Sequence, residues 1–138
     1  MLATLVVGAT ATAREAAIAA ALDTSIDTAL ILEGLPDGSS RLDALSALSA
    51  IHIVRIAPGC LCCTGNLTMR VSLNRILRRH PTRLYIGVAT FEHLDRIRGF
   101  LTQTPYDGLL QLTQDLHAYS RVPMPSIPRR QQRVSRSA

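Results

Sequence analysis

The chain has 138 residues, of which 47% are hydrophobic and 4% aromatic, and these values fit one domain with a modest core. No apolar run reaches the roughly 18 residues that a membrane span needs. The amino terminus also lacks the basic stretch of a secretion signal. We therefore expect no membrane partner, and a cytoplasmic protein whose thiols stay reduced.

The net charge of +5 equals the contribution of the arginines that follow residue 120. These are Arg121, Arg129, Arg130, Arg133 and Arg136. Residues 121–138 are rich in Pro, Ser, Gln and Arg, which predicts a flexible basic tail after a folded domain over residues 1–120. The tail has no aromatic residue, so we favour a solvated tail over one that binds RNA, acidic proteins or lipid. We expect no specific nucleic-acid partner.

Apolar runs of strand length alternate with helical patterns along the domain. The runs that predict strands are residues 2–7, 28–32, 52–56, 84–89 and 109–112. The helical patterns are residues 13–22, a repeat of Leu42, Leu45, Leu48 and Ile51, a stripe of Leu67, Val71, Leu73, Ile76 and Leu77, and a repeat of Leu94, Ile97 and Leu101. Pro36-Asp37-Gly38 predicts a turn, and His80-Pro81 ends the third helix. The alternation predicts an α/β domain with a mostly parallel sheet.

All three cysteines of the chain, Cys60, Cys62 and Cys63, lie within four positions after a predicted strand. Thiolates this close direct several sulfur atoms at one point, and Zn(II), Cu(I) and Co(II) prefer such ligands. An odd number of cysteines with this spacing argues against a static disulfide framework. The spacing favours a metal site over a reversible disulfide or three inert residues in a turn.

The loop after the first strand has the position of a phosphate-binding P-loop and reads Gly8-Ala9-Thr10-Ala11-Thr12-Ala13-Arg14-Glu15. In the GxxxxGK[ST] pattern Gly8 matches, whereas Ala13, Arg14 and Glu15 replace the second glycine, the lysine and the hydroxyl residue. The planar fork of Arg does not reproduce a slim ammonium, and Ala13 adds a side chain where backbone must approach phosphate. We interpret Glu15 as an acid that complements the positive end of the helix dipole.

The segment Pro58-Gly59-Cys60-Leu61-Cys62-Cys63, a following helix and then Pro81-Thr82-Arg83-Leu84-Tyr85-Ile86 resemble the CobW-type P-loop GTPases of the CobW/HypB/UreG superfamily. The resemblance covers about residues 2–113. It implies a three-layer P-loop NTPase-like domain that lacks the family's C-terminal domain. It also implies a metallochaperone role, with the three cysteines as metal ligands.

The nucleotide motifs of that family are changed in this chain. The family's Glu-x-x-Gly after the Walker B strand is replaced by Gly87-Val88-Ala89-Thr90, and no Asn-Lys-x-Asp motif exists because the chain has no lysine. We therefore expect that GTP and Mg(II) binding, and GTP hydrolysis, are lost. His93 occupies the position where family members often have a histidine.

We predict that the three thiolates hold one metal ion, Zn(II) in preference to Co(II), and deliver it to a client protein. The fourth ligand is water, a partner group or a histidine; the resemblance selects His93 over His52, His80 and His117. Arg55 or Arg70 would stabilise the thiolates. A separate complementing subunit would supply the missing nucleotide motifs or C-terminal domain, and exposed sheet edges would favour a homo-oligomer.

Three alternatives remain open. A divergent but active GTPase predicts stabilisation by nucleotide. A redox module predicts a reversible disulfide and no dependence on metal. A decayed paralogue predicts affinity for neither metal nor nucleotide.

Overall fold

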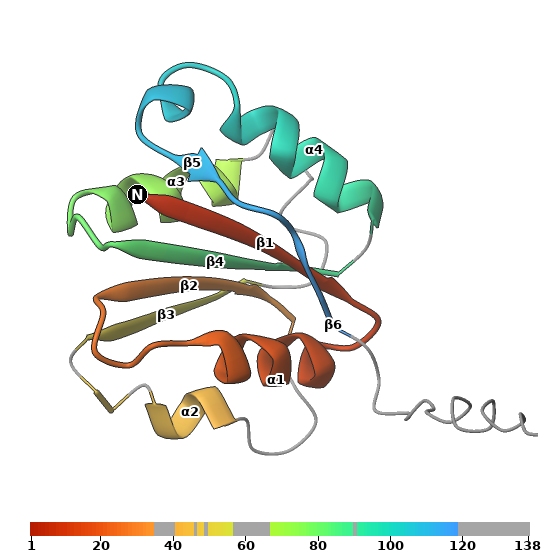
Figure 1. Cartoon of the computed structure of the whole chain (residues 1–138). Helices are drawn as coiled ribbons and strands as arrows, with labels where there is room; N and C mark the ends of the chain where they lie inside the picture. Colours follow the sequence, from red (N-terminus) through yellow and green to blue (C-terminus); the bar gives the residue numbers. More distant parts are fainter. Residues whose placement is uncertain (35–40, 46, 49, 57–66, 90, 119–138) are drawn as a thin grey trace, which may run out of the picture.

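The computed structural model describes residues 1–34, 41–45, 47–48, 50–56, 67–89 and 91–118. One sheet lies between two layers of helices, with α1 (Ala11–Ala21) and α2 (Arg41–Leu45) on one face and α3 (Leu67–Leu77) and α4 (Phe91–Leu101) on the other (Figure 1). This confirms the predicted α/β fold, a P-loop NTPase-like arrangement of three layers with a mostly parallel sheet. The predicted turn at residues 36–38 and the basic tail lie outside the described residues.

The sheet has β1 between β4 and two short strands, and β3 at the far edge. Its strands are β1 (Leu2–Gly8), β2 (Thr28–Glu33), β3 (Ile51–Ile56), β4 (Arg83–Val88), β5 (Gln111–Leu112) and β6 (Leu116–Ala118). The order is β3-β2-β4-β1-β5, and β6 also pairs with β1. Every pair between described strands is parallel. The carboxyl ends therefore meet at one edge, where ligands bind in sheets of this kind.

Alternation along the buried strands fills two cores. In β2, Ala29 and Ile31 belong to the core under α3 and α4, whereas Leu30 and Leu32 belong to the core under α1 and α2. All four are at most 1% exposed. Strands buried on both faces read as continuous apolar runs, and this explains why the sequence pattern locates them well.

Two helix boundaries follow from local chemistry. The helix α1 begins at Ala11, two residues earlier than predicted, because Thr10 caps it and its hydroxyl accepts a hydrogen bond from the Ala13 amide (3.0 Å). The helix α3 ends before His80, which adopts a left-handed backbone conformation (φ 55°), and Pro81. The predicted stop at His80-Pro81 is confirmed.

Two of the predicted helical patterns differ from the structure. The helix α2 ends at Leu45, and Ile51 begins β3 instead of extending the leucine repeat. On α3 the buried stripe consists of Met69, Leu73 and Ile76. Leu67 and Val71, which were expected in that stripe, are 56% and 50% exposed. Among the described residues, no helix has the length and apolar character of a membrane span.

Candidate functional site

The residues compared with the P-loop pattern lie at the carboxyl edge of the sheet. Gly8 ends β1, Glu33 ends β2, and Ala89 follows β4, while α1 begins close to the end of β1. The structure thus brings Gly8, Arg14 and Ala89, the last in the segment compared with the family's Glu-x-x-Gly, to one edge.

Gly8 is packed against β6. A Cβ atom at Gly8 would lie 2.7 Å from both the Cβ and the carbonyl oxygen of Ala118, and 3.2 Å from Cγ of Arg14. The parallel register places Ala118 directly beside Gly8. The first glycine of the loop is therefore required here by protein contacts within the domain.

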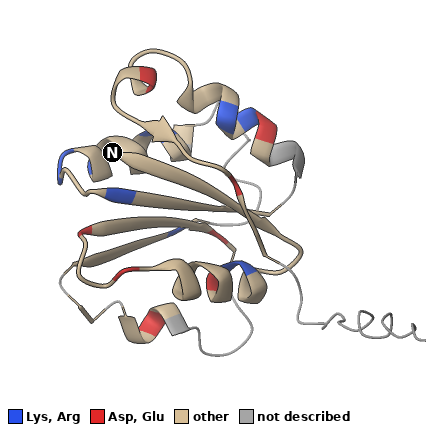
Figure 2. Ribbon diagram, in the orientation of Figure 1, with Lys and Arg blue, Asp and Glu red and all other residues tan. Residues whose placement is uncertain are grey.

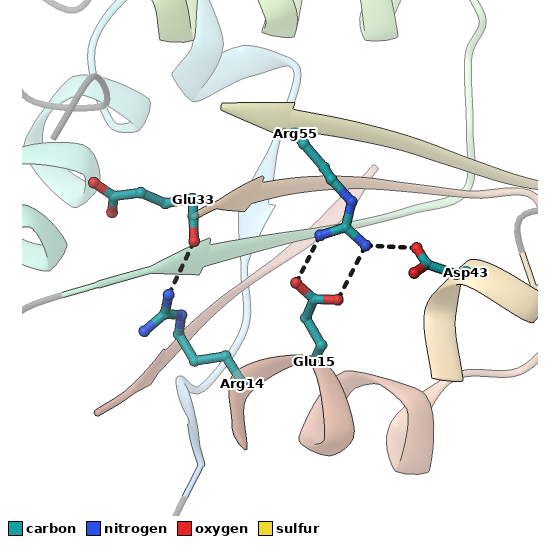
Figure 3. A network of polar contacts seen from close by, with 5 residues as sticks. All are labelled: Arg14, Glu15, Glu33, Asp43 and Arg55. Carbon is teal, nitrogen blue, oxygen red and sulfur yellow. Dashed lines mark hydrogen bonds and ion pairs between the residues drawn. The ribbon is translucent and has the colours of Figure 1, made fainter. Parts of the chain in front are cut away.

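Arg14 is turned into the protein and is only 4% exposed. Its guanidinium donates to the Gly8 carbonyl (2.7 Å) and to the Glu33 carbonyl (2.9 Å), and so ties α1 to the ends of β1 and β2. Figure 3 shows the second of these bonds. Burial lowers the pKa of Arg14, and the charges of Glu33 and Glu15 oppose that shift. Sequence reasoning identified the changed residue but did not reveal these partners.

Glu15, itself buried, forms an ion pair with the partly exposed Arg55 of β3. Its carboxylate, in a residue that is 3% exposed, accepts two hydrogen bonds from the Arg55 guanidinium (2.8 and 3.1 Å), which also pairs with Asp43 of α2 (2.8 Å; Figure 3). The hydrogen bond to Glu15 raises the pKa of Arg55, burial opposes the rise, and Asp43 adds to it. The helix-dipole interpretation of Glu15 is wrong, because α1 starts at Ala11 and Glu15 lies beyond its first turn.

Glu33 is a buried carboxylate that the sequence analysis missed. It is 1% exposed, and its Oε1 accepts a hydrogen bond from the Ala89 amide (2.8 Å), which joins the end of β2 to the end of β4. In the register of the sheet Glu33 lies beside Ile56, the last residue of β3 before the cysteine segment. The sequence did contain a signal for this residue: an acidic side chain ends an apolar run immediately before Gly34.

The predicted metal ligands are placed only in part. Cys60, Cys62 and Cys63 lie outside the described residues, and His93 lies in the first turn of α4, with its side chain outside the described part. Because β4 runs parallel to β3, the start of α4 lies at the same edge of the sheet as Ile56. Within the described part of the chain, no group of three metal-binding side chains is present.

The other histidines differ in their positions. His52 is near the amino end of β3 and hydrogen-bonds with Arg79, and His80 follows α3 at that same amino edge, opposite to Ile56. His117 lies in β6 beside Val7, toward the carboxyl edge.

The two predicted thiolate-stabilising arginines have other contacts in the described structure. Arg55 pairs with Glu15 and Asp43, and the Arg70 guanidinium lies 5.7 Å from the centre of the Phe100 ring. The ion pairs of Arg55 are on the face covered by α1 and α2, whereas Ile56 belongs to the opposite core. Stabilisation of thiolates by either arginine stays a prediction.

A comparison with curated proteins relates part of the chain to a zinc chaperone. Over 74 residues the chain is 36% identical to the zinc chaperone YeiR of Escherichia coli (strain K12). The chain is a distant relative of a zinc chaperone. The match covers 53% of this chain and 23% of YeiR. No family model and no solved structure matches the chain.

The contact between Gly8 and Ala118 predicts a large cost for one added methyl group. We expect Gly8→Ala to lower the free energy of unfolding by about 1–3 kcal/mol, because β6 must move away from β1. Gly99→Ala is the matched control: its Cβ has no atom within 4 Å, and in the exposed part of α4 alanine should add about 0.5–1 kcal/mol. Urea unfolding measures both, and equal effects would contradict the role given to Gly8.

Proposed function

We propose that this chain is a CobW-like metallochaperone-type domain that carries Zn(II) on the thiolates of Cys60, Cys62 and Cys63 and passes it to a client protein. The similarity to a zinc chaperone carries the proposal, and the clustering of every cysteine in one short motif supports it. Three thiolates satisfy most of a tetrahedral zinc site. The same set accepts Co(II) as a spectroscopic substitute.

The fourth coordination position is proposed for His93, with water or a client group as the alternative occupant. The parallel sheet supports His93, because α4 begins at the edge where β3 ends in Ile56. His52 and His80 are at the opposite edge. A position that a client group can take over suits transfer of the ion better than a closed structural site does.

We infer that this role does not use GTP or Mg(II). A phosphate site needs N–H groups directed at the ligand, whereas the guanidinium of Arg14 donates to the carbonyls of Gly8 and Glu33. The buried carboxylate of Glu15 follows directly in α1. The pair with Arg55 offsets part of the Glu15 charge, and the remainder would repel a phosphate group. These contacts support the proposal that the loop after β1 does not hold a nucleoside triphosphate.

The proposed setting is the cytoplasm, where thiols stay reduced. A complementing subunit or a second copy of the chain is proposed as a further partner. The redox alternative shares the cysteines but needs no metal, and a decayed paralogue binds neither ligand. The test must therefore separate metal binding from disulfide formation.

A Co(II) titration of the reduced protein tests the proposal. We expect a saturable thiolate-to-metal charge-transfer band at one ion per chain, its loss on addition of Zn(II), and no band in Cys60→Ser/Cys62→Ser/Cys63→Ser. The control is His52→Gln, at the other edge of the sheet, which should keep the band. Circular dichroism verifies that each variant is folded.

Two outcomes would reject the metal role. One is equal weak Co(II) binding by the parent and the triple variant. The other is a reversible loss of two free thiols under mild oxidant in a protein that shows no charge-transfer band, which would favour the redox module.

A further inference from the structure

We propose that the outward side of α3 is the docking surface for the client protein, and that the client presents apolar and acidic side chains to it. This inference rests on the proposed function. The α3 docking face consists of Leu67, Val71, Arg75 and Arg78. It starts at the helix end nearest in sequence to Cys63.

These four residues share one side of a helix that is firmly held on its other side. Spacings of four, four and three residues place them in a row, and the Arg78 amide continues the helical pattern by donating to the Asn74 carbonyl (3.3 Å). Leu67 and Val71 are two of the large apolar side chains that are exposed in the described structure. The opposite side is anchored by Met69 and Leu73, both 0% exposed, and by their core.

The charge on this segment has one sign. Residues 67–80 contain four arginines and no acidic residue, and Figure 2 shows basic colour without acidic colour on α3 and the turn after it. Arg70 lies over the Phe100 ring, and Arg79 contacts His52. For Arg75 and Arg78, by contrast, the described part of the chain provides neither an ion pair nor a hydrogen-bonded side chain. The exposed side of α4, in contrast, mixes Asp95 with Arg96.

The arrangement along α3 identifies the kind of partner. The apolar pair lies at the start of the helix, four residues after Cys63, and the basic pair lies about 12–16 Å further along the axis at 1.5 Å per residue. A client bound there would place apolar side chains at the start of α3 and acidic side chains at its far end. A nucleic acid would use the arginines through its phosphates but would gain nothing specific from Leu67 and Val71. The combination therefore favours an acidic protein segment.

The probe is a fluorescein-labelled 18-residue peptide with two leucines one turn apart, followed by glutamates two and three turns later. Fluorescence anisotropy with the full chain should show saturable, salt-dependent binding. We expect the Kd to rise at least tenfold for Arg75→Glu/Arg78→Glu and at least threefold for Leu67→Ser/Val71→Ser. A peptide with lysines in place of the glutamates should not bind.

Two matched controls locate the binding. Arg96→Glu, exposed on α4, and Arg129→Glu/Arg130→Glu, in the basic tail, should each leave the Kd within twofold of the parent value. Both α3 variants should keep the Co(II) charge-transfer band and the circular dichroism spectrum of the parent. A lost docking face is thereby separated from a lost metal site.

Three results would overturn the proposal. They are failure of the acidic peptide to bind the parent, binding that the α3 variants do not weaken, and tighter binding of an 18-nucleotide single-stranded RNA that the Arg75→Glu/Arg78→Glu variant abolishes. The last result would assign the face to nucleic acid instead of a client protein.

Discussion

Replacing Arg14 by Met is expected to lower the free energy of unfolding by about 2–6 kcal/mol, since one buried and one partly buried carbonyl each lose a charged donor at about 1–3 kcal/mol apiece. Met retains most of the aliphatic packing, so the loss measures the guanidinium contacts with Gly8 and Glu33. Urea unfolding followed by circular dichroism gives the value. The same samples, heated with and without GTP and Mg(II), should show no shift in Tm for the parent protein.

Two further variants test the Arg14 interpretation. Arg14→Lys should fall between the parent and Arg14→Met, because one ammonium group does not reproduce a planar fork that reaches two carbonyls. Arg96→Met, at an exposed position of α4, should change stability by less than about 0.5 kcal/mol. If Arg14→Lys were more stable than the parent and gained stability from GTP, the site would be a nucleotide pocket after all.

Replacing Arg55 by Met is expected to cost about 3–5 kcal/mol, since it leaves the buried carboxylate of Glu15 without its partner. The reverse change, Glu15→Gln, should cost less, about 1–3 kcal/mol, because Arg55 is partly exposed and keeps its pair with Asp43. Glu15 is more deeply buried than Arg55, so leaving Glu15 unpaired should cost more stability than leaving Arg55 unpaired. Equilibrium urea unfolding of both variants measures it.

The double variant Glu15→Gln/Arg55→Met isolates the pair. Its loss of stability should be smaller than the sum of the two single losses by about 1–3 kcal/mol, because the second change removes a charge that the first one left unpaired. Additive losses would show that the two side chains stabilise the fold independently. Asp43→Asn serves as the exposed comparison and should have an effect below about 1 kcal/mol.

The sheet was predictable from the sequence because strands that are buried on both faces appear as continuous apolar runs. The runs at residues 2–7, 28–32 and 84–89 agree with β1, β2 and β4 within a residue or two. The strand β6 was not predicted, since Leu116-His117-Ala118 has neither length nor apolar continuity and forms a strand only where β1 offers a free edge. Whether such a short segment forms a strand depends on pairing with a distant part of the chain.

The helix α3 shows that the spacing of apolar residues does not always predict which side of a helix is buried. Its sequence has apolar residues on two sides, and spacing alone does not tell which side faces the sheet. The structure buries Met69 and exposes Leu67 and Val71. The same limit applies to α2, where a repeat of leucines continues past the helix end.

For the P-loop position, the sequence revealed the mismatches to the family pattern, and the structure showed which contacts these side chains make. Mismatches to the P-loop pattern at Arg14 and Glu15 were sufficient to predict a poor phosphate site. The partners of these side chains come from β1, β2 and β3, up to 40 residues away, and no local pattern encodes such contacts. The cysteines remain the part of the site that the sequence identifies best.

The position of β1 inside the sheet affects how the domain folds during translation. This strand is made before the other described strands, yet its neighbours are β4, which ends at Val88, and the β5–β6 region, which ends at Ala118. The pair β2 and β3 can form early in translation, while β1 has no strand to join until β4 emerges. Its second edge stays open as a template for foreign strands until residue 118 has been released from the exit tunnel. Co-translational folding of this domain is therefore completed late. During that time β1 is accessible to chaperones before β4, β5 and β6 are available to pair with it.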